Sequence, residues 1–152
     1  MSFTPLTDSQ RLEIYNRYVG IPWVKGGNTI AGADCWGLFT LASNDVHGVI
    51  VKEYIGSTVT GNELSGIIET QLASENWHES SLPRDGDLAV MYDKGTRRPG
   101  HMGMFIGNGL ILHSPDHDGS PVKLITSSIH PVRLLKNIFH KIEFYRYDND
   151  TE

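Results

Sequence analysis

Residues 101–114, HMGMFIGNGLILHS, carry the clearest structural pattern in this chain. Two apolar runs flank residues 107–109 (Gly-Asn-Gly), a pattern typical of a β-hairpin. A three-residue turn pairs Met104 with Leu112 and gathers the large aliphatic side chains on one face, whereas a two-residue turn would mix polar and apolar side chains on both faces. We therefore predict the three-residue register, with glycine in the left-handed conformation at the last turn position. The apolar face then holds Met102, Met104, Ile106, Leu110 and Leu112.

The same register brings two histidines together on the opposite face of the hairpin. His113 lies opposite Gly103, one diagonal step from His101. Such cross-strand diagonals are roughly 7 Å apart, and we expect the glycine between the two rings to leave open space. The apolar pattern alone therefore predicts that His101 and His113 are neighbours, with no assumption about function. The other histidines, His47, His78, His130 and His140, have no partner that the pattern reveals.

Helices are predicted in the first half of the chain. A capping box of Thr7 and Gln10 opens the first helix, with an inward face of Leu12, Tyr15, Tyr18 and Val19. A second helix begins at Cys35, after the glycine-rich residues 20–34. Its inward residues are Cys35, Leu38, Phe39, Ala42 and Val46. The capping and inward residues of a third helix are Thr60, Glu63, Leu64, Ile67, Ile68 and Leu72.

Strands are predicted in the second half, at residues 87–92, 101–106, 110–113, 122–125 and 140–147. Helices followed by an antiparallel sheet indicate an α+β fold. We expect residues 1–152 to form one domain, since no repeat or long linker interrupts the chain.

Composition excludes several classes of function. The net charge of −5 argues against nucleic acid as the main partner, and a single cysteine excludes both a disulfide framework and a multi-cysteine zinc site. No apolar run approaches the ~20 residues that span a bilayer, and residues 1–13 lack the pattern of a secretory signal, so we expect neither membrane insertion nor export. Residues 26–27 (Gly-Gly) lack the Lys-Ser/Thr continuation of a phosphate loop, so no cofactor is expected.

The single cysteine is placed where a thiol could be reactive. At a helix start, free N–H groups and the positive end of the helix dipole favour a thiolate at Cys35 and can bind an oxyanion. His101 could act as its base in a thiolate–imidazolium pair, and His113 could orient His101. Two alternatives stay open. A lone cysteine on an apolar helix face is more often a small buried hydrophobe, and Cys35, His101 and His113 could also bind a catalytic zinc.

Three blocks together resemble the NlpC family of papain-like peptidoglycan cysteine peptidases. They are PWVKGGNTIAGADCWGL (22–38), GDLAVM (86–91) and the hairpin, so the resemblance covers roughly residues 20–114. It implies a circularly permuted papain-like α+β fold and hydrolysis of stem peptides, typically between D-glutamate and a diamino acid. By position, Cys35 matches the nucleophile, His101 the base and His113 the orienting residue. Asp34 matches the acidic residue that helps bind the free amine of the stem peptide.

Two residues depart from the family pattern. Trp23 stands where the family usually has tyrosine, and Trp36 where it often has serine. Both flank the predicted site, so we expect them to contribute to substrate binding in a pocket of altered shape. The motif DCWGL (34–38) looks most like that of family members encoded with bacteriophage tails. This resemblance implies a virion tail-tip location and tail-tip protein partners. Alternatives are a structural tail protein with little activity and a thiol-dependent amidase or acyltransferase.

Overall fold

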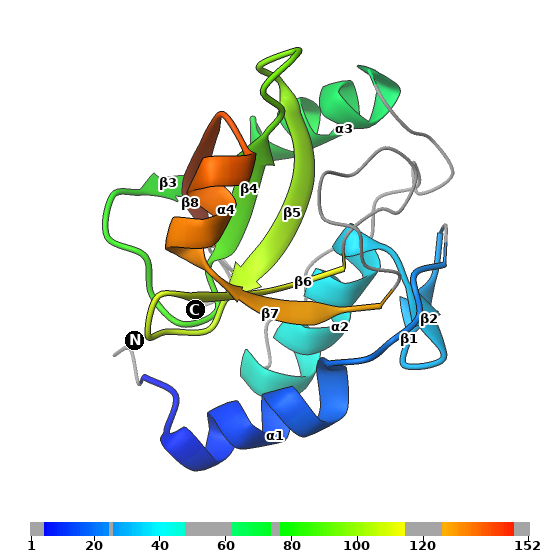
Figure 1. Ribbon diagram of the computed structural model, residues 1–152, viewed down its shortest axis with the longest axis vertical. Helices are drawn as coiled ribbons and strands as arrows, with labels where there is room; N and C mark the ends of the chain where they lie inside the picture. The colour runs from blue at the N-terminus through cyan, green and yellow to red at the C-terminus, as the bar shows by residue number, and fades with distance from the viewer. Residues whose placement is uncertain (1–4, 25, 48–61, 74–76, 115–125, 148–152) are drawn as a thin grey trace.

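A six-stranded antiparallel sheet with the strand order β3-β8-β4-β5-β6-β7 forms the centre of the structure (Figure 1). The computed structural model describes residues 5–24, 26–47, 62–73, 77–114 and 126–147. The sheet strands are β3 (Trp77–Ser80), β4 (Leu88–Tyr92), β5 (Pro99–Phe105), β6 (Leu110–His113), β7 (Ser128–Pro131) and β8 (Lys141–Tyr147). The strands β1 (Asn28–Thr29) and β2 (Gly32–Ala33) form a separate pair. The helices are α1 (Asp8–Tyr18), α2 (Cys35–His47), α3 (Asn62–Leu72) and α4 (Val132–Ile138).

The predicted hairpin register is confirmed in β5 and β6. Met104 lies opposite Leu112, and the N–H of Ile106 donates to the carbonyl of Leu110 at 3.0 Å. Within the turn, Asn108 and Gly109 have φ values of 54° and 70°, as the two central residues of a type I′ turn require. The turn is therefore an Asn-Gly β-turn with one extra residue, Gly107, before it. This extra residue sets the register that the apolar pattern predicts.

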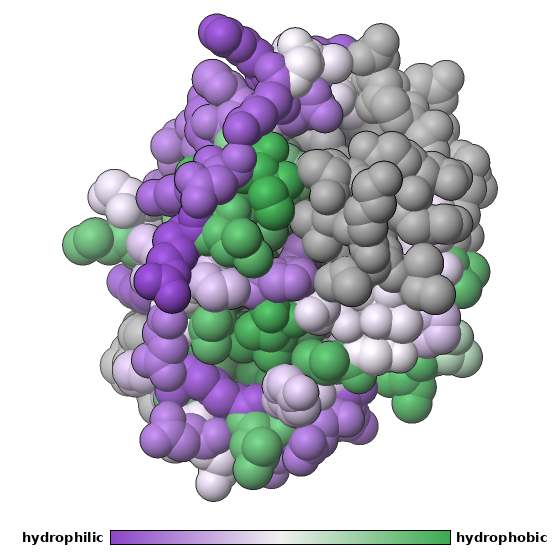
Figure 2. All heavy atoms as spheres, in the orientation of Figure 1, coloured by the Kyte–Doolittle hydropathy of each residue, from purple (hydrophilic) through white to green (hydrophobic). Residues whose placement is uncertain are grey.

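Both faces of the sheet are covered. The face that carries Met102 and Met104 packs against the buried side chains of α2, including Leu38 and Phe39. The opposite face carries Phe105, Ile111 and other side chains that pack against α4 and the residue after it, Phe139. In Figure 2, hydrophobic residues gather around α4 and β7 at the centre of the face shown. The hairpin therefore lies in the middle of the molecule, between two hydrophobic clusters.

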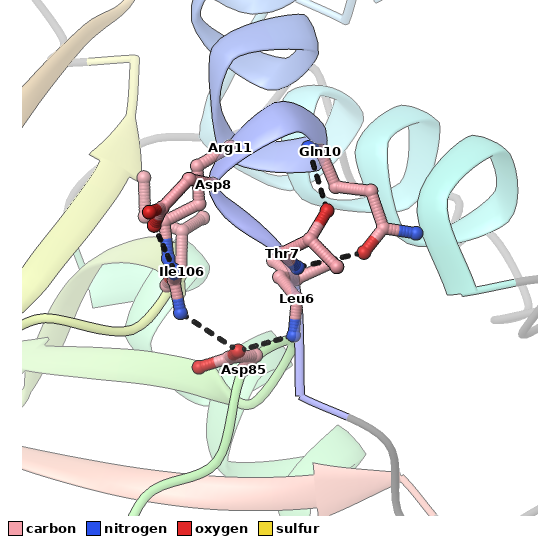
Figure 3. A network of polar contacts seen from close by, with 7 residues as sticks. All are labelled: Leu6, Thr7, Asp8, Gln10, Arg11, Asp85 and Ile106. Carbon is pink, nitrogen blue, oxygen red and sulfur yellow. Dashed lines mark hydrogen bonds and ion pairs between the residues drawn. The ribbon is translucent and has the colours of Figure 1, made fainter.

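The first predicted helix is confirmed, and Tyr18 and Val19 face the core as predicted, but the other two residues of the predicted inward face do not. The capping box is present, because Thr7 Oγ1 accepts from the Gln10 N–H at 3.1 Å and the Thr7 N–H donates to Gln10 Oε1 at 2.8 Å (Figure 3). Leu12 and Tyr15, however, are 61% and 55% exposed. Within α1, the residues that face inward are Arg11, Ile14 and Tyr18.

A polar anchor explains this rotation of α1. Arg11 Nε donates to the carbonyl of Ile106 at 2.8 Å, and its Nη2 lies 3.2 Å from Asp85 Oδ2 (Figure 3). The Leu6 N–H donates to the same carboxylate oxygen at 2.7 Å. Since Arg11, Ile14 and Tyr18 are spaced three and four residues apart, binding the guanidinium to the end of the hairpin turns Leu12 toward solvent.

The second helix begins at Cys35 as predicted, and Cys35, Leu38, Phe39 and Ala42 are buried. In α3, Ile68 is buried and Leu72 is half-buried. The side chains of Val46, Leu64 and Ile67, the second capping box, and the predicted strand at 122–125 lie outside the described residues. No described helix combines the length and the apolar character needed to cross a membrane.

Candidate active site

Three histidines on three adjacent strands form one hydrogen-bonded chain. His101 Nε2 lies 2.8 Å from His113 Nδ1, and His113 Nε2 lies 2.6 Å from His130 Nδ1. The register explains the arrangement, since His113 lies opposite Gly103 and His130 lies opposite Ile111. Each ring is thus one diagonal step from the next on the same face of the sheet. The prediction that His101 and His113 are neighbours is confirmed.

Gly103, between the His101 and His113 rings, does not leave the open space that we predicted. A Cβ at Gly103 would lie 2.7 Å from the carbonyl oxygen of Leu112 and 2.9 Å from His113 Cβ. The predicted open space is therefore absent, because β6 and the base of the His113 side chain fill it. Glycine is required here since any side chain would push β6 away from β5 and separate the rings.

Burial keeps these rings neutral. His101 is 6% exposed, and its ring stacks on Phe139 with 5.8 Å between centroids and 13° between planes. This burial lowers the pKa of His101 to about 4. Burial, followed by the adjacent His101 and His130 rings, lowers the pKa of His113 well below its usual range, and burial also lowers the pKa of His130. The predicted resting thiolate–imidazolium pair is thus disfavoured, and a neutral base is favoured instead.

The hydrogen bonds restrict the tautomers of the chain. A neutral imidazole has one N–H and one acceptor nitrogen. Both bonds form only when all three rings carry their proton on Nε2 or when all three carry it on Nδ1. In the first arrangement His101 Nε2 donates to His113, and His101 Nδ1 remains an acceptor. Only this arrangement allows His101 to take a proton from a thiol.

The buried histidine makes the protein sensitive to acid. The unfolded chain binds a proton at His101 below about pH 6.5, whereas the folded chain does so only near a pKa of about 4. Because the unfolded state binds more protons in this window, stability falls as the pH falls. From pH 7 to pH 4, we expect His101 to lower the free energy of unfolding by about 3 kcal/mol.

Urea unfolding of the wild type and of His101→Gln at pH 7 and pH 4 measures how much His101 contributes to the change in the free energy of unfolding. The wild type should lose about 3 kcal/mol more than the variant on acidification. The same loss in both proteins would show that His101 is not held neutral by burial.

Asp34 caps the helix that starts at Cys35. Its Oδ1 accepts from the Gly37 N–H at 2.7 Å and its Oδ2 from the Gly26 N–H at 3.2 Å. Burial raises the pKa of Asp34 above its usual value, while these backbone donors oppose that change. Asp34 therefore joins the glycine-rich loop to the first turn of α2. Its role toward a substrate amine stays a prediction.

A second contact ties the start of α2 to the histidine strands. Ser114, directly after His113, donates from Oγ to the carbonyl of Ala33 at 3.2 Å. Ala33 is two residues before Cys35, and α2 packs against β5 and β6 (Figure 1). Cys35 itself is 8% exposed. The structure thus joins the segment that carries the thiol to the strand that carries His113.

The two tryptophans that flank the cysteine differ in their surroundings. Trp23 is half-buried between Pro22 and Val24, whose backbone groups hydrogen-bond to Ala33. Trp36 is 4% exposed and packs on Phe39 and Trp77, with centroid distances of 5.7 and 6.2 Å. Trp23 therefore lies beside the segment that leads to Cys35. Trp36 supports α2 from within the core, so its predicted direct contact with substrate is disfavoured.

The histidine geometry does not suit zinc. Two nitrogens bound to one tetrahedral zinc at the usual bond length lie about 3.3 Å apart, whereas His101 Nε2 and His113 Nδ1 are separated by 2.8 Å. The other nitrogen of His113 is engaged by His130. Among the described residues, no group of three or more potential ligands could hold a metal ion. The separation of these two nitrogens is that of a hydrogen bond, which favours the thiol alternative over the zinc alternative.

Sequence reasoning missed His130 and Phe139. Nothing local in SIHP (128–131) indicates which strand this segment pairs with, so the sequence reveals no partner for His130. The helix before Phe139 is also absent from the sequence-based predictions, although Val132, Leu135 and Ile138 recur at helical spacing. That spacing is the one signal that could have identified the cover over His101.

Comparisons with known proteins identify the family. Residues 20–138 match the model of the NlpC/P60 family. The solved NlpC/p60 domain of the peptidoglycan hydrolase SagA is similar, with a TM-score of 0.55 and 16% identity over 91% of this chain and 98% of that one. No curated protein matches the sequence.

Two longer proteins share the fold. A family protein from Bacillus cereus has a TM-score of 0.61 and 20% identity over 95% of this chain and 41% of its own. NlpC1 from Trichomonas vaginalis has a TM-score of 0.60 and 16% identity over 96% of this chain and 46% of its own. This chain thus spans less than half of either protein. The chain belongs to the NlpC/P60 family and has its papain-like α+β fold.

Proposed function

We propose that this protein is a cysteine peptidase that cleaves peptidoglycan stem peptides. The observation that carries the proposal is the hydrogen-bonded His101–His113 pair on strands tied to the start of the Cys35 helix. Membership of the NlpC/P60 family and the similarity to a domain of a peptidoglycan hydrolase support it.

In the proposed reaction, Cys35 Sγ attacks the scissile carbonyl carbon while the thiol proton moves to His101 Nδ1. His101 Nε2–H donates to His113 Nδ1 throughout, which orients the ring and stabilises the imidazolium. The C–N bond then breaks, and His101 returns the proton to the leaving amine. Water attacks the resulting thioester with His101 again as base, which releases the carboxylic acid and restores the thiol.

The buried position of His101 shapes the order of events. An imidazole whose pKa is about 4 is a weak base, so proton removal from the thiol accompanies attack. The same weakness makes the imidazolium a strong acid for the leaving amine. Neutral rings also avoid a permanent buried charge, which would be costly in this environment.

The helix start supplies fewer oxyanion donors than expected from the sequence. The Gly37 N–H already donates to Asp34 Oδ1, and the Leu38 N–H donates to the Asp34 carbonyl. We place the developing oxyanion beside the N–H of Cys35, because this group belongs to the residue that carries the attacking sulfur.

For the substrate, we propose the bond between D-glutamate and the diamino acid. Asp34 would bind the free amine of the stem peptide in addition to the backbone N–H groups that already donate to its carboxylate. Trp23, half-buried next to Ala33, would contact the peptide. Trp36 would act only by holding α2 in place.

Digestion of purified peptidoglycan followed by mass spectrometry tests this function. The wild type should release fragments that end at D-glutamate, and Cys35→Ala should release none. Identical fragments from both proteins would show that Cys35 is not the nucleophile. Fragments cut at the sugar–peptide amide would instead identify an amidase.

We also propose that the chain acts at a bacteriophage tail tip, where it would open the wall locally. The motif DCWGL at residues 34–38 supports this tail-tip location. Mass spectrometry of purified virions from a strain that carries the gene should detect the chain, and virions without it would contradict the placement. Detection together with an inactive wild-type protein would indicate a structural tail component.

A further inference from the structure

The histidine chain extends one residue beyond the pair used in the proposed reaction. His130 Nδ1 lies 2.6 Å from His113 Nε2, and His113 is fully buried. We propose that His130 is a positioning residue, which holds His113 in the Nε2–H tautomer and thereby keeps His101 Nδ1 as the proton acceptor. This inference rests on the proposed function.

The ring protons of His101, His113 and His130 depend on one another, because each neutral ring carries only one. His113 has an exposed fraction of 0%, so solvent cannot choose its tautomer. Its two ring nitrogens face His101 and His130. When His130 Nδ1 accepts, His113 must donate from Nε2 and accept at Nδ1, and His101 must donate from Nε2. Without an acceptor at residue 130, the opposite tautomer of His113 would place a proton against His101 Nε2. The only proton of a neutral His101 would then be on Nδ1, where it blocks proton transfer from the thiol.

The backbone holds His130 rigidly enough for this role. Before it, the Ser127 N–H donates to the Ile21 carbonyl at 2.8 Å, and the Gly20 N–H donates to the Ser127 carbonyl at 3.0 Å. After it, the Val132 N–H donates to the Gly109 carbonyl at 2.8 Å. Both ends of β7 are therefore fixed, one to the loop after α1 and the other to the hairpin turn. A short strand fixed at both ends suits the precise orientation of a ring.

Two variants at residue 130 separate an acceptor role from a packing role. In His130→Asn, the amide Oδ1 can occupy the place of Nδ1 and accept from His113, whereas His130→Leu removes the acceptor. With a synthetic stem peptide, we expect His130→Leu to lower kcat by about 10- to 100-fold with KM within about twofold. His130→Asn should stay within about threefold of the wild type in both constants.

Nitrogen-15 spectra of histidine-labelled protein read the tautomers directly. The wild type and His130→Asn should show His113 as the Nε2–H tautomer, and His130→Leu should lose this preference. Equal loss of kcat in both variants, full activity in His130→Leu, or an Nδ1–H tautomer in the wild type would each overturn the inference. Since the spectra require no substrate, a protein that does not cleave peptidoglycan but shows the Nε2–H tautomer would refute only the proposed function.

Discussion

His101→Gln is expected to reduce kcat/KM toward a stem peptide by at least about 10³-fold. Glutamine can retain a hydrogen bond to His113, but its amide cannot take the thiol proton and return it to the leaving amine. The loss should therefore fall mainly on kcat. Steady-state kinetics with a soluble stem peptide measures both constants.

The matched control is His140→Gln. His140 is an exposed histidine in the turn between α4 and β8, and its substitution should change kcat/KM by no more than about twofold. His101→Gln with more than a tenth of the wild-type activity would exclude His101 as the base.

Gly37→Ala is expected to destabilise the fold strongly. A Cβ at Gly37 would lie 1.9 Å from the carbonyl oxygen of Gly27 and 3.0 Å from Asn28 Cα. Both atoms belong to the backbone, so the glycine-rich loop would have to move away from α2. We expect a loss of about 2 to 3 kcal/mol in the free energy of unfolding, with a displaced Asp34 cap.

Gly66→Ala in α3 is the control for that substitution. Beyond the neighbouring backbone of α3, the nearest heavy atom to its Cβ would be Arg98 Nη2 at 3.9 Å, an ordinary contact. Alanine there should stabilise the protein by about 0.5 to 1 kcal/mol, because it restricts the unfolded chain and favours the helix. Urea unfolding of both variants gives the comparison, and a similar change in the two would refute the steric account of Gly37.

The parts of the site that could be predicted are those that local patterns determine. Alternation in β5 and β6 allows only one register that gathers the apolar side chains, and that register makes His101 and His113 neighbours. The start of α2 at Cys35 follows from the glycine-rich loop and the apolar spacing after it. Both signals lie within short stretches of sequence.

The parts that could not be predicted depend on contacts between distant segments. His130 reaches His113 only because β7 pairs with β6, and no local pattern specifies that pairing. The rotation of α1 depends on Arg11 binding Asp85, which is 74 residues away. Helical periodicity alone favoured Leu12 as an inward residue, but the ion pair and the carbonyl of Ile106 outweigh it.

The rate at which iodoacetamide alkylates Cys35 at pH 6 shows whether His101 activates this thiol. It needs no substrate, and mass spectrometry locates the modified residue. We predict that Cys35 in the wild type reacts at least about tenfold faster than Cys35 in His101→Gln, because only the wild type has a base for the thiol proton. Equal rates in the two proteins would show that His101 does not activate the thiol of Cys35.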